Sequence, residues 1–484
     1  MGGRVGARGG TGVVTDDHGQ KMTDPSPKLA YPRVPDSAVG TLGFLKAVRR
    51  NGVSIYGPDV FAKPISRRKV GRQHFVLLNR PDYIEHVLLS HVDNYPKGRL
   101  NRRILGPALG QGLLTAEGDF WRRQRRIAAP AFQHARLIGL ADTMVASSAG
   151  LATRWQAPAE GGEALDVAHE MMALTMEIVA LALFSHDIGD RIEPLGAAVG
   201  TLIGSLGRPH VFDLAGLPEW LPRRRDPAVT AALSYLDSAI AEILAARRAR
   251  PETPGQGSGN DLLGMLLDTR DADTGEGMSD RQLRDEIVTL FAAGHETTAN
   301  TLAWIWYLLA MHPEAEARLH GELDAVLGGR DPGYADLEAL PYTRMVAEEA
   351  MRLYPPAYSI SRVAAADDVI DGHAIPKGSF INVSPWVTQR NPTLWPEPGR
   401  FDPERFMPAQ VKARSRYAYF PFGGGPRICI GNGFALMEAR LILATLAQRY
   451  RLALVPGQDI EPLGRITLRP SNGLHMTLQR RGGG

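Results

Sequence analysis

Phe422-Gly423-Gly424-Gly425-Pro426-Arg427-Ile428-Cys429-Ile430-Gly431 is the most informative segment of this chain. It contains the only cysteine among 484 residues, so an internal disulfide and a multi-cysteine metal site are both excluded. Three successive glycines and a proline predict a tight loop whose backbone approaches another group closely. A helix should follow, because Asn432 could cap it and one face carries Phe434, Met437, Leu441 and Ala444. Cys429 therefore precedes a helix N-terminus, where backbone N–H groups and the helix dipole stabilise a thiolate, the form that binds a metal.

Every fixed position of this segment agrees with Phe-Gly-x-Gly-x-Arg-x-Cys-x-Gly, and the segment thereby resembles the haem-binding signature of the cytochrome P450 family. The resemblance implies a haem b whose iron is held by Cys429. It also implies that Arg427 lies near a haem propionate and that Phe422 and Gly423 belong to the loop that binds the cofactor. The residues alone leave one alternative open, a glycine-rich surface loop with an inert, half-buried cysteine.

The composition is that of an ordinary globular enzyme. Lys and Arg number 55 and Asp and Glu 52, so the net charge of +3 gives no reason to expect nucleic acid as a partner. We expect a disordered tail over residues 1–25 and one catalytic domain over residues 26–484, with Met22 as an alternative start to Met1. The tail lacks the apolar core of a signal peptide, and the apolar runs 171–184 and 302–311 are too short or interrupted to span a bilayer. A cytoplasmic protein without a membrane anchor is therefore expected.

A second informative segment begins at Ser279, which forms a capping-box pattern with Gln282. No proline follows until Pro313, so the sequence predicts a helix of about thirty residues, about 50 Å long. Its centre reads Ala292-Ala293-Gly294-His295-Glu296-Thr297-Thr298, and a glycine with two threonines is a poor choice for a helix interior. Such a conflict between local preference and structure indicates a functional site.

Two functional interpretations of this centre compete with that of an ordinary core helix. The zinc motif His-Glu-x-x-His is excluded, because Ala299 stands where the second histidine should be. The centre resembles instead the oxygen-activating motif of the cytochrome P450 family. This resemblance implies that Gly294 leaves a groove for dioxygen, that Thr297 offers its hydroxyl to the bound oxygen and that Glu296 relays protons from solvent. His295 is then a packing or surface residue.

Basic residues for the haem carboxylates are expected from two other segments. Trp121 and Arg125 are four apart, so they share one face of a helix predicted to open at Glu117. In the family such a pair binds a haem propionate, and the resemblance assigns the second propionate to Arg362, in a predicted strand. A solvated basic helix face with Trp121 as a packing anchor is the alternative. The helix carries three other arginines, Arg122, Arg123 and Arg126. They either form a basic patch for an acidic redox partner or are charges on a solvent-exposed face.

A third segment carries a charge pair. Glu349 and Arg352 are three apart on a helix stopped by Pro355 and Pro356, so their side chains can meet. The pair resembles the family's Glu-x-x-Arg, and Phe401-Asp402-Pro403-Glu404-Arg405-Phe406 resembles the segment whose arginine joins it. The resemblance implies that Glu349, Arg352 and Arg405 form a structural network behind the haem, without a catalytic role. Alone, Glu-x-x-Arg is common and is usually a surface pair.

Shorter patterns complete the fold prediction. Strands are expected before Asn79, a helix over 81–90, and a hairpin with an Asp-Gly turn over 369–375. We also expect a long loop over 95–114 and a closing hairpin over 466–478, and the resemblance makes residues 204–222 the roof of the substrate pocket. The fold class is mainly α with small β-sheets, and it resembles the cytochrome P450 fold, a single large helical domain that encloses the haem.

The function that the resemblance implies is a haem-thiolate monooxygenase, which inserts one oxygen atom of O2 into a small apolar substrate by hydroxylation or epoxidation. The thiolate ligand favours cleavage of the O–O bond. No flavin or ferredoxin segment is recognisable, so a ferredoxin and its reductase, or an equivalent pair, are expected as electron donors. Two rivals stay open. One is a peroxide-dependent haem-thiolate enzyme, which the intact Glu296-Thr297 disfavours, and the other is a haem-binding sensor or carrier without turnover. Fatty acids, terpenes, steroids and aromatics fit an apolar pocket equally well.

Overall fold

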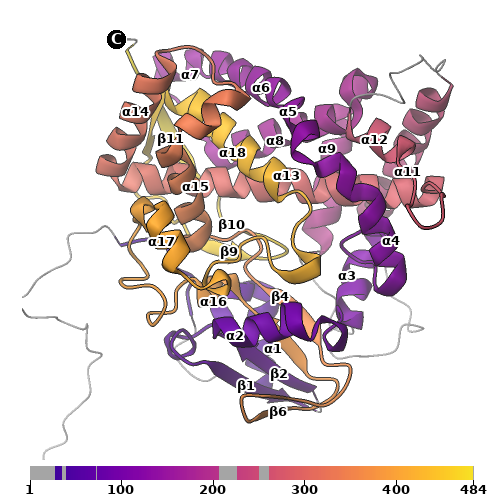
Figure 1. The fold of residues 1–484 in the computed structure, drawn as a ribbon. Coiled ribbons are helices and arrows are strands. Elements are labelled where there is room, and N and C mark those ends of the chain that lie inside the picture. Colours follow the sequence, from indigo (N-terminus) through magenta and orange to yellow (C-terminus); the bar gives the residue numbers. More distant parts are fainter. Residues whose placement is uncertain (1–27, 35–39, 72, 207–225, 250–260, 483–484) are drawn as a thin grey trace, which may run out of the picture.

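The computed structural model of the protein describes residues 28–34, 40–71, 73–206, 226–249 and 261–482 (Figure 1). The predicted disordered tail and nearly all of the predicted pocket roof lie outside these residues. Helices fill most of the view and the largest sheet lies at its bottom. The α-helices are α1 Thr41–Arg50, α2 Pro81–Glu85, α3 Arg99–Leu109, α4 Gly118–Ala128, α5 His134–Ile138, α6 Ala141–Arg154, α7 Gln156–Gly161, α8 Val167–Phe184, α9 Ile192–Leu206, α11 Pro227–Arg248, α12 Leu262–Asp268, α13 Asp280–Met311, α14 Pro313–Leu327, α15 Pro341–Leu353, α16 Pro385–Thr388, α17 Pro408–Ala413 and α18 Asn432–Ala447.

Strands form four small sheets in the described residues, as the predicted fold class requires. The strands are β1 Ile65–Val70, β2 Gln73–Leu78, β3 Ala164–Asp166, β4 Ile360–Val363, β5 Asp368–Ile370, β6 His373–Ile375, β7 Phe380–Val383, β8 Tyr450–Leu454, β9 Pro462–Gly464, β10 Leu468–Pro470 and β11 His475–Arg480. Their orders are β1-β2-β7-β4, β10-β9, β3-β11-β8 and β5-β6.

Helix α13 crosses the molecule and forms its centre (Figure 1). It begins after Ser279 with the predicted capping box to Gln282 and runs for 32 residues. It packs against α8, α15 and α18. Because neighbours cover most of its circumference, buried residues such as Ala303, Trp304 and Ile305 follow one another directly rather than forming one stripe. The prediction of a helix of about thirty residues is confirmed.

Two helices, α8 and α11, are long and apolar enough to cross a membrane by length and composition alone. In α8, 56% of the apolar window is buried inside the molecule, where the helix packs along α13. The apolar run 171–184 is the C-terminal part of α8, which begins after Asp166 because that side chain caps it by accepting a hydrogen bond from Ala168 N. The core helix of a globular protein passes the same test of length and composition.

The four-stranded sheet places one of the predicted basic residues. Strands β2 and β7 pair in parallel, and β4 pairs with β7 so that Arg362 lies opposite Ile381. A second apolar core, which includes Val76, Ile84 and Val383, joins this sheet to α2. The predicted strands before Asn79 are β1 and β2. The predicted helix over 81–90 is α2 followed by a turn of π-helix, His86–Ser90.

The hairpin predicted over 369–375 is confirmed. Strands β5 and β6 pair in antiparallel register, and the turn between them is formed by Asp371 and Gly372. Their φ angles of 48° and 77° are the left-handed values that a tight hairpin turn requires.

Two other predictions are wrong. The stretch 95–114 is not a long loop, because α3 occupies its middle: Leu105, Ala108 and Leu109 share a buried face despite Pro107, and Gly110 ends the helix with φ 54°. The stretch 466–478 is not one hairpin, because β10 pairs with β9 whereas β11 pairs with β8 and β3. The alternation of apolar residues correctly predicted strands in this stretch. Each strand pairs with strands that lie earlier in the chain rather than with the other.

Candidate functional site

The cysteine loop is shaped by close backbone approaches. Gly423 has φ 75° and Gly425 φ 65°, which only glycine adopts without strain. A Cβ on Gly425 would overlap the carbonyl of Leu88 in the π-helical turn after α2. The loop closes on itself, since Cys429 N donates to Phe422 O at 2.9 Å. The sulfur is thus fixed immediately before α18, whose N-cap is Gly431 rather than the predicted Asn432.

The Cys429 side chain is accessible, although the surrounding protein still desolvates its thiol. Burial raises the pKa of the thiol, while the N–H of Gly431 and the charge of Arg125 lower it. The predicted stabilisation of a thiolate by the loop is therefore opposed by desolvation. A cationic partner at the sulfur is what would favour the ionised form here.

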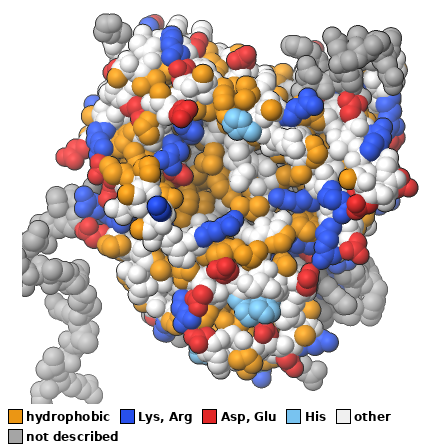
Figure 2. All heavy atoms as spheres, viewed as in Figure 1, with side chains coloured by type: hydrophobic (Ala, Val, Ile, Leu, Met, Phe, Trp, Pro, Cys, Tyr) orange, Lys and Arg blue, Asp and Glu red, His pale blue; other side chains and the backbone are white. Residues whose placement is uncertain are grey.

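A cluster of basic side chains lies beside this loop; we call Lys97, Arg125, Arg362 and Arg427 the basic cluster. Arg427 donates to Glu117 Oε2 at 2.6 Å and stacks over the ring of Trp121, 4.1 Å from its centroid. Figure 2 shows the wider setting, with apolar side chains gathered across the middle of this face and Lys and Arg beside them.

The basic cluster carries more positive charge than its surroundings balance. Arg362 is 6% exposed, and its Nε has no hydrogen-bond partner among the described residues. Burial, and then the charge of Arg427, lowers the pKa of Arg362 to about 10. Burial and the neighbouring arginines lower the pKa of Lys97 to about 7, and Glu117 is the acid that acts against them.

These residues fit a haem. A ligand with two carboxylates would pair with the unpartnered Nε of Arg362, whose Nη1 donates to Ser361 O at 2.8 Å, and with the charge of Lys97 and Arg125. Arg427 belongs to the same loop as Cys429. The other cations come from segments far away in the sequence, yet the charge of Arg125 acts on Cys429. Sequence reasoning missed Lys97 and Glu117, because neither belongs to a pattern that the chain displays.

The centre of α13 presents an accessible face in an otherwise buried helix. Ala293 is exposed, and the Thr297 hydroxyl, also accessible, donates to the Ala293 carbonyl at 2.8 Å. A Cβ on Gly294 would lie 3.0 Å from Val179 of α8, so the glycine serves the crossing of these two helices. Its missing side chain therefore faces α8, and the groove for dioxygen stays a prediction. Within the described chain, α13 makes no hydrogen bond or ion pair with the cysteine loop.

Glu296 turns away from the Ala293 face and toward the C-terminal strands. It is 5% exposed and accepts a hydrogen bond of 2.7 Å from Thr467, which in turn accepts one of 3.1 Å from Asn300. Burial raises the pKa of Glu296, while Thr467 and the charge of Arg469 lower it. Thr467 was not predicted from the sequence. His295 is buried and its ring nitrogen contacts the Phe291 carbonyl, as expected of a packing residue.

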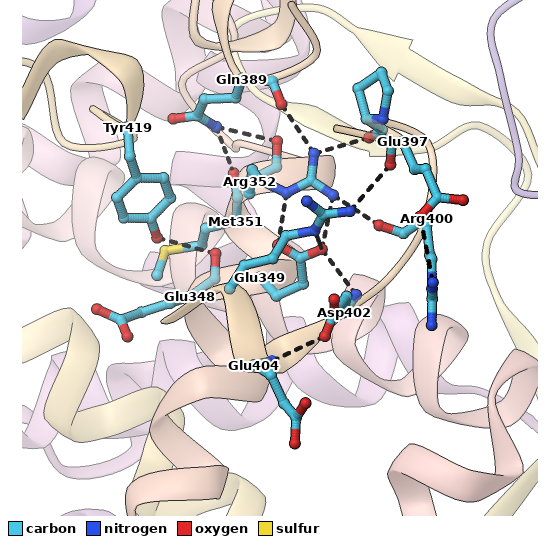
Figure 3. Close-up of polar contacts among 12 residues, drawn as sticks. Glu348, Glu349, Met351, Arg352, Gln389, Glu397, Arg400, Asp402, Glu404 and Tyr419 are labelled. Atoms are coloured by element: carbon cyan, nitrogen blue, oxygen red, sulfur yellow. Dashed lines mark hydrogen bonds and ion pairs between the residues drawn. The ribbon is translucent and has the colours of Figure 1, made fainter. Parts of the chain in front are cut away.

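Glu349 and Arg352 form a fully buried pair, with hydrogen bonds of 2.6 and 2.7 Å (Figure 3). Arg405 lies 3.7 Å from Glu349 Oε1, close enough for an ion pair although not for a hydrogen bond. Arg352 also donates to the carbonyls of Gln389, Pro398 and Arg400. Gln389 accepts from Phe420 N at 3.0 Å, which connects the pair to the approach of the cysteine loop.

The remaining arginines of α4 do not form a free basic patch, because each has acidic partners. Arg122 contacts Asp93 and Asp119, and Arg123 lies 3.3 Å from Glu276. The partners of Arg126 are Asp271 and Asp273.

Comparison with known proteins identifies the family of this chain. The family model described as Cytochrome P450 matches residues 59–476. The chain belongs to the cytochrome P450 family. This P450 is accordingly a haem-thiolate monooxygenase with haem b as its cofactor.

Two curated relatives come from Streptomyces melanosporofaciens. The P450 is 37% identical to cyclooctatin synthase over 401 residues, which cover 83% of this chain and 85% of the relative. It is 35% identical to cyclooctat-9-en-7-ol 5-monooxygenase, with 81% and 83% covered. The crystal structure of the cytochrome P450DA haem domain superposes with a TM-score of 0.77 at 25% identity, covering 94% of this chain and 99% of that one. The predicted fold is therefore confirmed.

Proposed function

We propose that Cys429 is the axial ligand of the haem iron and that the basic cluster binds the two propionates. The observation that carries this proposal is the placement of the only cysteine beside four basic side chains with one acid, Glu117, among them. When bound, the haem supplies the activation of dioxygen. Trp121, Phe422 and Gly423 shape the apolar and backbone surroundings of the cofactor.

The chain's own contribution to the reaction is the supply of protons and the exclusion of water. We propose that the Thr297 hydroxyl holds a proton at the accessible face of α13 and that Glu296 replenishes it from solvent. Glu296 suits this role because burial raises the pKa of its carboxyl, whereas the hydrogen bond from Thr467 lowers it. Gly294 contributes by allowing α8 to pack closely behind this segment.

The substrate that we propose is a cyclic alkene with few hydroxyl groups. The support is the relative whose name, cyclooctat-9-en-7-ol 5-monooxygenase, gives an unsaturated alcohol as the molecule acted on. Electrons would come from a ferredoxin and its reductase, and the protein would work in the cytoplasm, where a single unpaired thiol remains reduced.

A spectroscopic screen tests this proposal. Purified holoenzyme is titrated with cyclic alkenes, their mono-alcohols and straight-chain fatty acids of similar carbon number, and the shift of the haem from low to high spin is followed. We expect the cyclic compounds to saturate the shift at lower concentration. Reconstitution with ferredoxin, reductase and 18O2 should then yield a product with one labelled oxygen. Preference for fatty acids, or turnover with peroxide alone, would contradict the substrate or the electron source respectively.

A further inference from the structure

Residues 110–117, which we call the strap, connect α3 to α4 and run from α13 to the cysteine loop. At the α13 end, Gln111 N donates to Asp285 Oδ2 at 2.8 Å. Leu113 N donates to Glu286 Oε2 at 3.0 Å. Two adjacent carboxyl groups of α13 therefore hold alternate backbone amides of the strap.

The backbone of the strap lies directly against side chains of α13. A Cβ on Gly110 would overlap the carboxylate of Asp285, and one on Gly112 would overlap the hydroxyl of Thr289. Glycine at both positions is thus required by the close approach of the backbone to α13. The sequence of the strap is suited to this docked position.

The other end of the strap enters the basic cluster. Arg427 donates to Ala116 O at 3.1 Å and to Glu117 Oε2 at 2.6 Å, while Glu117 Oε1 accepts from Lys97 N at 3.1 Å. The Lys97 ammonium group donates to Leu114 O at 2.6 Å. Whatever fixes the strap on α13 therefore also fixes the carboxylate that orients Arg427.

Glu286 is an unfavourable residue for a core position, because burying a carboxyl group costs free energy of desolvation. Its side chain is fully buried, and its Oε1 has no hydrogen-bond partner among the described residues. Two neighbouring polar atoms share this condition, Gln124 Nε2 of α4 and Thr289 Oγ1. An unpaired buried carboxyl oxygen destabilises a fold, so the residue is not explained by packing alone.

We propose that Asp285 and Glu286 are positioning residues, which hold the strap on α13 and thereby place Glu117 and Arg427 for binding of the haem carboxylates. The second half of this proposal rests on the proposed function of the basic cluster. The first half concerns the protein chain alone. Neither carboxylate touches the reacting atoms, so their effect is on retention of the cofactor and on order in the strap.

The electrostatic surroundings of Glu286 are consistent with this role. Burial raises the pKa of its carboxyl to about 7. The hydrogen bond from Leu113 N and the nearby side chain of Gln124 lower the pKa, Asp285 raises it, and Lys97 lowers it. These are the polar and charged groups that face Glu286 from the strap, from α4, from α13 and from the segment before α3.

Amide hydrogen exchange of the holoenzyme tests directly whether Asp285 and Glu286 hold the strap on α13. In Glu286→Leu and Asp285→Ala, the amides of the strap should exchange about tenfold faster or more than in the parent protein. Glu286→Gln keeps an acceptor oxygen and should restore part of the protection. Glu438→Gln is the matched control, because Glu438 is an equally buried glutamate on α18 and should leave the strap unchanged. Gly112→Ala is a second route, since its Cβ displaces the strap while both carboxylates stay.

Transfer of haem to apomyoglobin provides the second readout. We expect release to be several-fold faster in the strap variants and unchanged in Glu438→Gln. Unchanged exchange in Glu286→Leu, Asp285→Ala and Gly112→Ala would overturn the hold on the strap. Faster exchange with unchanged haem release would overturn the link to the basic cluster. If the parent protein bound no thiolate-ligated haem, the proposed function would fail, whereas the exchange result would still decide whether α13 holds the strap.

Discussion

The side chains of Glu349 and Arg352 meet in two parallel hydrogen bonds, Nε to Oε2 at 2.6 Å and Nη2 to Oε1 at 2.7 Å, and neither side chain is exposed. The guanidinium group binds three backbone carbonyls in addition, so all of its donors are directed at acceptors from three separate segments. Glu349 also accepts from Asp402 N at 2.9 Å. This pair organises the backbone behind the cysteine loop.

Removing one partner should therefore be costly. Glu349→Ala leaves Arg352 charged and unpaired in the core, which costs about 3–5 kcal/mol, a large part of the stability of an ordinary domain. We expect little folded, haem-loaded protein, measured by yield and by denaturant unfolding. Glu404→Ala is the control, because the Arg318–Glu404 pair of 2.8 Å is exposed and should contribute less than about 1 kcal/mol. A stable, haem-loaded Glu349→Ala protein would refute the structural network.

The Thr297 hydroxyl is predicted to hold a proton for the reaction. Thr297→Ala should keep the haem but form roughly tenfold less product per NAD(P)H consumed, with the remaining electrons released as peroxide or water. Thr301→Ala is the matched control, since that hydroxyl makes the same kind of bond to the carbonyl four residues earlier, 3.0 Å away. Equal coupling in the two variants would remove Thr297 from the proton supply.

Thr467 should influence the pKa of the Glu296 carboxyl. Its hydrogen bond lowers the pKa of the Glu296 carboxyl, so Thr467→Val should raise that pKa and leave Glu296 protonated over a wider range. One hydrogen bond of about 1 kcal/mol corresponds to about 0.7 pH units. The alkaline limb of the plot of coupled product formation against pH, where Glu296 loses the proton that it supplies, should move to higher pH by about that amount. Thr467→Ser should return it, and an unmoved limb would show that Glu296 does not supply protons.

Glu438 should make folding dependent on pH. Burial raises the pKa of its carboxyl from about 4.5 to about 8. Below pH 4.5 the carboxyl is neutral in both the folded and the unfolded protein, and the stability of the folded protein is then not reduced by burying a charge. Stability is lost as the pH rises to 8, because the folded protein must then bury a charge. Glu438→Gln should be roughly 1–3 kcal/mol more stable relative to the parent at pH 8 than at pH 5. Denaturant unfolding at both values measures this, and an equal difference at the two would contradict it.

Local patterns predicted those parts of the site that lie close together in sequence. The glycine loop around Cys429, the capping box of Ser279 and the spacing of Glu349 and Arg352 each express their structure within about ten residues. The same holds for the Asp371-Gly372 turn, where the backbone conformation alone limits the residue choice.

What the sequence did not reveal depends on contacts between distant segments. Lys97, Glu117 and Thr467 have no distinguishing neighbours, and each acquires its role only from the fold that brings it to Arg427 or Glu296. The helix α3 was missed for a different reason, because its proline and glycine outweighed its apolar spacing in a local interpretation.

The absorption spectrum of the dithionite-reduced protein under carbon monoxide tests the central assignment most directly, with Cys429→Ala beside the parent. The parent should show the strongly red-shifted Soret band of a thiolate-bound haem, and Cys429→Ala should lose it even when haem is supplied. A red-shifted band in Cys429→Ala, or none in the reconstituted parent, would contradict Cys429 as the iron ligand.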